Sequence, residues 1–314
     1  MRRLLSLLWN GQALRHLPIA LAASAEPPVR IELHGPSSPA RDVSDAHVPV
    51  SMRPLLLGVR VDPSVADAEL RASSLVVTDR VTGERLGEIR LESAGSIPLG
   101  DARLALFRTT GCRNATAPAL TRWWRYALSW EHARRAPARG DGLCMSASDL
   151  RCLNVYYMWP RPVYLIGVAS GDRSNFFPMD LVGRVDASHF LLALRATSPA
   201  IELMETSRVI AMSAAPADRL QTVYALGAHH RKSSVDTSTL PFAVVRSARH
   251  GLPVLATGFT RELSVQQVHR HGSHVLFVCR VDAEQGTTPH QLAHVSLMYA
   301  EWQARHGRPF QPAT

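Results

Sequence analysis

The sequence predicts a mainly β protein with helical insertions, arranged as two domains. Short segments with strand-like alternation or continuous apolar character recur along the chain, and only a few stretches carry helical signals. A Pro- and Gly-rich stretch over residues 136–149 has the composition of an exposed connection. We therefore expect a β-rich N-terminal domain over residues 1–140 that ends in a Trp-rich helix. Residues 150–314 are expected to form a small barrel with helical insertions.

The N-terminal domain has five strand-like segments and one helical segment. Alternating or apolar character predicts strands over residues 29–34, 55–61, 75–78, 86–92 and 104–109, with a hairpin turn over residues 79–84. A helix is predicted over residues 118–135, where Trp123, Ala127 and Trp130 have the spacing of one buried stripe. Nothing in this domain forms a catalytic constellation.

The C-terminal domain has more strand signals and two helices. Strands are predicted over residues 163–169, 175–182, 190–195, 209–212, 242–246, 263–266 and 274–281. Ser198 followed by Pro199 predicts a helix start with serine at the N-cap and proline at the first helical position. A second helix is predicted over residues 218–226.

Composition argues for a folded protein and against a nucleic-acid partner. The chain has 314 residues, 46% of them hydrophobic and 19% charged, which suits two folded domains rather than disorder. The net charge of +9 comes almost entirely from arginine, since Lys232 is the only lysine. That usage is typical of a GC-rich bacterial genome, and no nucleic-acid-binding motif accompanies it.

Cysteine spacing and the N-terminal sequence favour a cytoplasmic protein. The four cysteines, Cys112, Cys144, Cys152 and Cys279, form no CxxC pair, so we expect reduced thiols and no structural zinc site. Residues 1–25 partly imitate a signal peptide, but polar residues between positions 10 and 16 interrupt its apolar stretch. No apolar run reaches the roughly 20 residues that span a bilayer, so no membrane association is expected.

Several catalytic motifs are absent. The sequence has no GxGxxG after a strand, no Walker A motif, no GxSxG elbow and no HExxH. His290 and His294 could share one face of a helix and bind a metal, but solvated histidines are the simpler interpretation, and we expect no metal site. Cys279 lies in an apolar strand, where a thiol is usually inert.

The strongest local signal suits a phosphate-bearing cofactor. The segment from Arg195 to Pro199 ends a predicted strand and begins a predicted helix. A helix N-terminus attracts anions, Arg195 adds a bidentate donor, and Thr197 and Ser198 add hydroxyl groups. The alternative is that Ser198 only caps the helix while Arg195 is solvated.

Four stretches between Val155 and Ala283 together resemble the flavin reductase-like family of FMN-binding split β-barrels. They are Pro162–Asp172, Ser174–Gly183, Phe190–Leu203 with Val209–Met212 after it, and Gly272–Val281. They are similar to the family's first strand and turn, the strand along the flavin ring, the phosphate strand, loop and helix, and the late Gly-x-His strand. The N-terminal extension is not part of the family's usual unit.

The resemblance implies a homodimer with FMN, or FAD in its place, near the subunit interface, and NAD(P)H as co-substrate. His274 matches a histidine near the nicotinamide side and is the expected catalytic residue. Lys232 lies in a loop that reaches the flavin in the family, although a solvated basic loop is an equal alternative. The expected cofactor-binding residues are Asn175, Phe176, Phe177, Pro178, Met179, Asp180, Leu181, Arg195, Thr197, Ser198 and Lys232.

The resemblance thus predicts an FMN-dependent oxidoreductase of the flavin reductase type, which transfers hydride from NAD(P)H to flavin. The chain departs from the family's Ser-x-x-Pro-Pro turn, because Arg184–His189 stands in its place. A non-catalytic flavin-binding or protein-interaction module on a split barrel is therefore a second hypothesis. A third is that the N-terminal domain acts on a substrate while the barrel supplies electrons.

Overall fold

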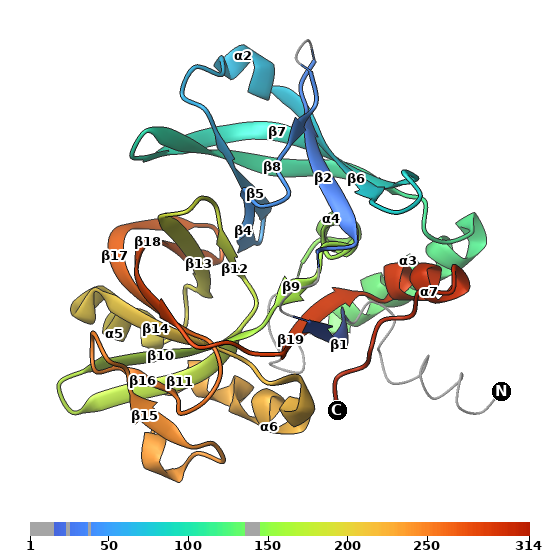
Figure 1. Ribbon diagram of the computed structural model, residues 1–314. Helices are drawn as coiled ribbons and strands as arrows, with labels where there is room; N and C mark the ends of the chain where they lie inside the picture. Colours follow the sequence, from blue (N-terminus) through green and yellow to red (C-terminus); the bar gives the residue numbers. More distant parts are fainter. Residues whose placement is uncertain (1–15, 23–25, 37–38, 136–144) are drawn as a thin grey trace. The chain divides into compact units, whose positions relative to one another are not determined.

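The computed structural model describes residues 16–22, 26–36, 39–135 and 145–314, and they form two compact units (Figure 1). Of the described residues, those within 16–17, 27–160 and 295–310 belong to the first unit. Those within 18–26, 161–294 and 311–314 belong to the second. The contacts therefore group residues 150–160 and 295–310 with the N-terminal sheet, whereas the sequence pattern placed them with the barrel. The predicted mainly β fold with helical insertions is confirmed.

The first unit is built on one antiparallel seven-stranded sheet in the order β3-β2-β6-β7-β8-β5-β4. All five predicted strands are present, and the apolar segment before residue 55 adds β4, which is buried at every position. The strands are β2 (Val29–His34), β3 (Arg41–Asp42), β4 (His47–Met52), β5 (Leu55–Val61), β6 (Ala72–Asp79), β7 (Arg85–Leu99) and β8 (Ala102–Asn114).

Asp79 explains why the chain turns between β6 and β7. Its side chain, which is fully buried, accepts hydrogen bonds from the Thr82 backbone N–H at 2.8 Å and the Thr82 hydroxyl at 3.0 Å. Arg308 donates to the same carboxylate at 3.1 Å. Gly83 supplies the positive φ of 70° that the turn requires. The predicted hairpin turn over residues 79–84 is confirmed.

In the part of the first unit that the structure describes, four helices accompany the sheet: α2 (Asp67–Leu70), α3 (Ala119–Arg135), α4 (Ala147–Tyr156) and α7 (Leu297–Arg305). The sequence pattern predicted only α3. Ser146 caps α4, because its hydroxyl accepts the Asp149 backbone N–H at 3.0 Å. The prediction of a buried stripe on α3 is wrong, since Trp123 is 65% exposed and Trp130 is 52% exposed.

The second unit is a split barrel built on one antiparallel sheet in the order β11-β10-β14-β17-β18-β13-β12 (Figure 1). Its two edge strands follow one another in sequence, so the sheet curls until both ends meet at residues 180–181. Arg161 bridges this junction by donating to the carbonyls of Asp180 and Val182. The strands are β10 (Tyr164–Ser170), β11 (Arg173–Met179), β12 (Val182–Arg184), β13 (His189–Arg195), β14 (Val209–Ala214), β17 (Thr260–His271) and β18 (His274–Gln285).

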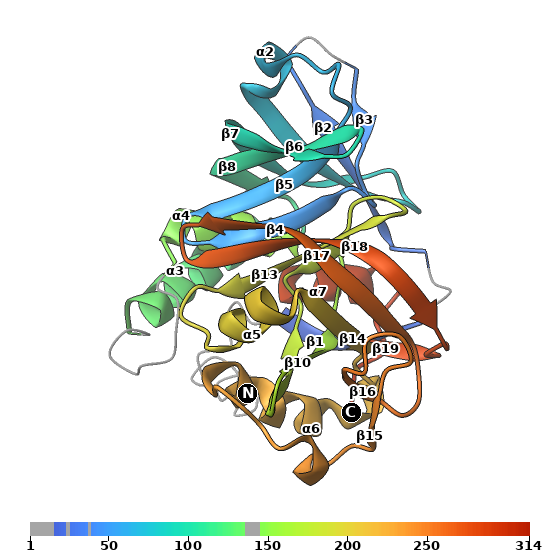
Figure 2. The ribbon, with the colours of Figure 1, turned by 90° about the vertical axis from the view of Figure 1, so that its left-hand side faces the viewer.

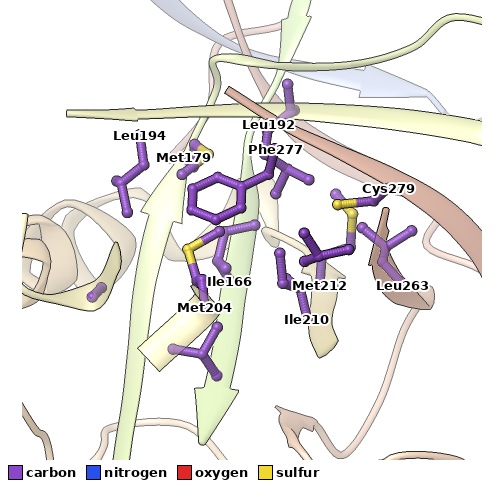
Figure 3. Packing of buried hydrophobic residues seen from close by; sticks show 14 of the residues in the cluster. Ile166, Met179, Leu192, Leu194, Met204, Ile210, Met212, Leu263, Phe277 and Cys279 are labelled. Atoms are coloured by element: carbon purple, nitrogen blue, oxygen red, sulfur yellow. The ribbon is translucent and has the colours of Figure 1, made fainter. Parts of the chain in front are cut away.

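The interior of this barrel is filled by apolar side chains, with Phe277 in the middle of the group drawn in Figure 3. Ile166 from β10, Leu192 from β13 and Met212 from β14 are each 0% exposed. Met204 of helix α5 (Ala200–Ser207) packs against the same group. The barrel is therefore a packed core, and a cofactor must bind outside it.

Smaller elements surround the barrel. Figure 2 shows the hairpin of β17 and β18 as two long, twisted strands. A second, three-stranded sheet runs in the order β1-β19-β9. The remaining elements are β1 (His16–Ala22), β9 (Arg161–Pro162), β15 (Val244–Arg246), β16 (Pro253–Leu255), β19 (His290–Ser296), α6 (Leu220–Ala225), and the 3-10 helices η2 (Ala217–Arg219), η3 (Leu226–Arg231) and η4 (Thr237–Thr239). Among the described residues, no helix is long and apolar enough to cross a membrane.

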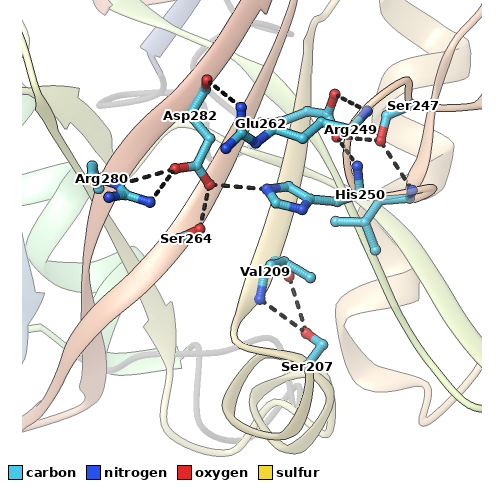
Figure 4. A network of polar contacts seen from close by, with 10 residues as sticks. Ser207, Val209, Ser247, Arg249, His250, Glu262, Ser264, Arg280 and Asp282 are labelled. Atoms are coloured by element: carbon cyan, nitrogen blue, oxygen red, sulfur yellow. Dashed lines mark hydrogen bonds and ion pairs between the residues drawn. The ribbon is translucent and has the colours of Figure 1, made fainter.

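Two carboxylates anchor the turn between β15 and β16 to the barrel (Figure 4). Glu262 of β17 accepts the Ser247 hydroxyl at 2.5 Å and the backbone N–H groups of Arg249 and His250 at 3.0 and 2.7 Å. Asp282 of β18 accepts the His250 ring nitrogen Nε2 at 2.9 Å. Burial by itself raises the pKa of Glu262, but these hydrogen bonds outweigh it and hold the pKa below its ordinary value.

Replacing Glu262 with alanine should destabilise the protein by about 2–3 kcal/mol, because it leaves buried backbone donors without an acceptor. Since the folded-state pKa of Glu262 is lowered, its contribution is present above the ordinary pKa and is lost as the pH falls through the lowered one. Thermal unfolding between about pH 6 and pH 3 should therefore show a shallower loss of stability in the variant than in the wild type. The exposed Asp172→Ala is the control, and an equally steep loss in both proteins would contradict the assignment.

Candidate functional site

Strand β11 lies at one end of the barrel sheet, and its outer edge is covered by η3 and the residues that follow it. The Val235 backbone N–H donates to the Ser174 carbonyl at 2.7 Å, and the His229 ring nitrogen Nδ1 lies 2.9 Å from the Phe176 carbonyl. Asn175, which is 0% exposed, donates from its amide to the carbonyls of His229 and Lys232 at 3.1 and 2.8 Å. At this edge, the carbonyls of Ser174 and Phe176 therefore already have hydrogen-bond partners within the chain.

The aromatic residues of β11 point into packed interiors. Phe177 and Met179 belong to the barrel core, and Phe176 belongs to a second apolar cluster that includes Val223 of α6 and Leu226 of η3. Both phenylalanines are 0% exposed. Of the predicted ring-lining segment, only Pro178, Asp180 and Leu181 have partly exposed side chains.

A chain of polar contacts begins at Asp180, just after β11. Its carboxylate accepts from the His294 Nδ1 at 2.7 Å, and the His294 Nε2 lies 3.0 Å from the Tyr224 hydroxyl. With Nδ1 protonated, Nε2 accepts the Tyr224 proton. His294 lies on the strand β19, so the idea of a helical metal pair with His290 is wrong. The described residues contain no cluster of three or more His, Cys, Asp or Glu suited to a metal.

Arg195 and the start of α5 form the second part of the site. Arg195 ends β13 and is paired in register with His274 at the start of β18. The expected N-cap at Ser198 is wrong, because α5 begins at Ala200 with Pro199 in the cap position. The Ser198 hydroxyl instead donates to the His230 carbonyl at 2.5 Å and thereby ties η3 to the start of α5. Thr197 is exposed.

The charge around Arg195 is positive. Burial and then the neighbouring Arg231 lower the pKa of the half-buried Arg195 guanidinium. Burial is also the main cause that lowers the pKa of His230, with Arg195 and Arg231 adding to it. Within the described residues, neither guanidinium group forms a hydrogen bond or an ion pair with another side chain or a carbonyl. This part of the surface is therefore a cationic cluster without a counter-ion from the protein.

His274 is buried, at 1% exposure, beside this cluster. Burial, followed by the charge of Arg195, lowers its pKa to about 4, so the ring is neutral near pH 7. Its Nδ1 lies 2.9 Å from the Ser273 hydroxyl. A buried, neutral ring of this kind can support Arg195 but offers little surface to a nucleotide.

The loop over residues 229–232 joins the two parts of the predicted site. It contacts Asn175 on β11 and Ser198 before α5, so residues far apart in sequence are brought together. The Lys232 side chain is exposed. His230 and Arg231 were not among the predicted site residues, although both lie in the basic run that drew attention to Lys232.

The described surface of the second unit also contains a cavity of about 790 Å³ away from these residues. Its lining includes Phe242, Leu255, Arg219 and His290, and none of the predicted site residues. The cavity therefore does not locate the predicted flavin site.

Comparison with known proteins gives structural neighbours only. No family model matches the chain. No curated protein matches it. The chain is similar to an FMN-binding protein from Thermus thermophilus with bound p-hydroxybenzaldehyde, over 42% of this chain and 74% of that one, with 25% identity and a TM-score of 0.36.

A structure of an FMN-binding protein from Thermus thermophilus with bound 1-cyclohex-2-enone is 27% identical, covers 42% and 73% of the two chains, and has a TM-score of 0.37. The NADH:FAD oxidoreductase from Streptomyces globisporus is 14% identical over 46% of this chain and 88% of its own, with a TM-score of 0.40. They are an FMN-binding protein and a flavin oxidoreductase, the kinds of protein that the sequence motifs resemble. Each likeness covers less than half of this chain.

Proposed function

We propose that this protein is an FMN-binding oxidoreductase of the flavin reductase type, which acts as a cytoplasmic homodimer and transfers hydride from NAD(P)H to flavin. One observation carries the proposal: the half-buried Arg195 and its neighbour Arg231 form no ion pair within the described part of the chain. A half-buried guanidinium near the positive charge of the exposed Arg231, with no carboxylate beside it, suits an anion, because a negative charge there would offset the repulsion between them. The phosphate of FMN is such an anion.

The residues around this cluster fit a phosphate. Arg195 can donate two parallel hydrogen bonds, Arg231 adds a second positive charge, and Thr197 offers an exposed hydroxyl. The Ser198 hydroxyl already donates its hydrogen bond to the His230 carbonyl, so it positions the loop and does not bind the anion.

Fewer residues are able to contact the flavin ring than the sequence motifs imply. Because η3 occupies the edge of β11 at residues 174–176, the ring can contact only the part of this segment from Pro178 to Leu181. His294 would hold the Asp180 carboxylate in a fixed orientation there.

When bound, FMN accepts hydride from a reduced nicotinamide, and this chemistry belongs to the cofactor. The protein's part is to neutralise the phosphate with Arg195 and Arg231 and to fix the ring against residues 178–181. Because hydride transfer to flavin needs no protein base, the neutral His274 is compatible with this role.

The covered edge of β11 favours a second candidate, a non-catalytic flavin-binding or protein-interaction module. In such a module, η3 would hold the ring strand in a form that binds flavin without admitting a nucleotide. Both candidates predict a bound flavin and therefore a yellow protein. Only the oxidoreductase predicts that NADH or NADPH reduces that flavin.

The absorption spectrum of the purified protein between roughly 350 and 500 nm, before and after anaerobic addition of NADH and of NADPH, tests these candidates. We expect a flavin spectrum that bleaches with one of the nucleotides. A flavin spectrum that does not bleach would select the non-catalytic module. A colourless protein that neither binds added FMN nor oxidises either nucleotide would refute both. Sedimentation velocity tests the dimer.

A further inference from the structure

Three side-chain contacts in the same register join strand β8 to helix α4 in the first unit. The Thr109 hydroxyl donates to Asp149 at 3.3 Å, and the Asn114 amide donates to Asn154 at 3.2 Å. Between these pairs, the Cys112 thiol forms a hydrogen bond with Cys152. Each pair is separated by 40 positions in the sequence. The neighbouring contacts on both sides therefore hold the two sulfurs opposite each other.

The two thiols differ in access and in protonation. Cys112 is half-buried, whereas Cys152 is 0% exposed. Because the Cys112 thiol donates to the Cys152 sulfur, the pKa of Cys112 is raised and the pKa of Cys152 is lowered. The Thr109 hydroxyl, whose single proton is shared between Asp149 and this sulfur, also lowers the pKa of Cys152. The pair thus has one sulfur that a small molecule can reach and one that carries thiolate character.

Neither thiol has a role in the proposed flavin site. Cys279, in the barrel core, is different again, because it is fully buried and burial raises its pKa. A buried thiol without a nearby partner is inert, whereas two thiols in contact are the arrangement from which a disulfide can form.

We propose that Cys112 and Cys152 form a reversible disulfide by exchange with a small-molecule disulfide of the glutathione type. In the first step the Cys112 thiol gives its proton to the Cys152 sulfur and attacks the small disulfide, which forms a mixed disulfide and releases one thiolate; this thiolate then takes the proton from Cys152. In the second step the Cys152 thiolate attacks the Cys112 sulfur, forms the internal S–S bond and releases the second thiolate. The two protein thiols lose two protons and two electrons, and the small disulfide is reduced to two thiols.

The bond would join α4 covalently to β8 and close a loop that contains α3. The oxidised and reduced proteins would then differ in whether α4 can leave the sheet. In a reducing compartment such a pair responds to the redox state and is not a permanent cross-link.

The test uses the full chain with Cys144→Ser in every protein, because Cys144 lies outside the described residues. The protein is incubated with oxidised glutathione, quenched by alkylation under denaturing conditions and analysed by mass spectrometry and peptide mapping. We expect two of the three remaining thiols to resist alkylation, with a single peptide pair linked through Cys112 and Cys152. Dithiothreitol should restore all three thiols.

Single substitutions separate the two steps. Cys152→Ser should stop at the mixed disulfide and carry one glutathione on Cys112, whereas Cys112→Ser should keep its thiols reduced because Cys152 is buried. Cys279→Ser is the matched control and should form the same link as its parent. Three alkylated thiols after oxidation, a stable glutathione adduct on the parent protein, or a link to Cys279 would each overturn the proposal.

Discussion

Replacing Gly167 with alanine should destabilise the second unit severely. Gly167 lies in the middle of β10, opposite Phe176 of β11 and Ala211 of β14. A Cβ atom at this position would lie 1.8 Å from the Pro253 carbonyl oxygen of β16. The obstacle is backbone and cannot move like the end of a side chain, so β16 would have to leave its place on the barrel. We expect a loss of about 3 kcal/mol or more in the free energy of unfolding.

Urea unfolding followed by circular dichroism measures this loss. Gly227→Ala is the control, because a Cβ atom there meets nothing within 4 Å, and its stability should be close to that of the wild type. If Gly167→Ala matched Gly227→Ala in unfolding midpoint, the close approach of β16 to β10 would be wrong.

Replacing Arg195 with glutamine should weaken FMN binding by about ten- to a hundredfold, if the proposed function is correct. The variant removes a charge-assisted bidentate donor from the phosphate site, an interaction of roughly 1.5–3 kcal/mol. Riboflavin has no phosphate, so its weaker binding should be unchanged in the same variant. Fluorescence titration of both flavins therefore separates the phosphate contact from a general disturbance of the site.

Arg71→Gln is the matched control for the change in net charge, because Arg71 is an exposed residue of the first unit. It should bind both flavins as the wild type does. Equal losses of FMN and riboflavin affinity in Arg195→Gln would mean that Arg195 maintains the structure of the site and does not bind the phosphate. No flavin binding by the wild-type protein would instead reject the proposed function itself.

The sequence predicted most strands because periodicity reports directly which side chains face an interior. Residues 29–34 and 55–61 became β2 and β5 with the predicted bounds. The predicted strand over residues 175–182 ends earlier, at Met179, because the chain passes from β11 to β12 at Asp180 and Leu181. Helix α4 was missed although Ser146 and Asp149 form its cap, since these polar residues were interpreted as a continuation of the connecting segment.

The candidate site shows where local sequence patterns stop being informative. The positions of Arg195 and Thr197 at the end of a strand followed from the pattern itself. The contact of Asn175 with the carbonyls of His229 and Lys232 could not, because it joins segments more than 50 residues apart. Local pattern was also insufficient for α3. The spacing of Trp123 and Trp130 placed them on one face of the helix, but it could not show whether that face is buried or exposed.

The covering of β11 by η3 has a consequence for the protein in concentrated solution. An open strand edge presents free N–H and C=O groups, which are a template for pairing with another chain. Val235 and His229 occupy these groups on Ser174 and Phe176, so this end of the barrel sheet cannot be extended by a second molecule. The loop therefore protects the protein from edge-to-edge aggregation, and this protection does not depend on any bound cofactor.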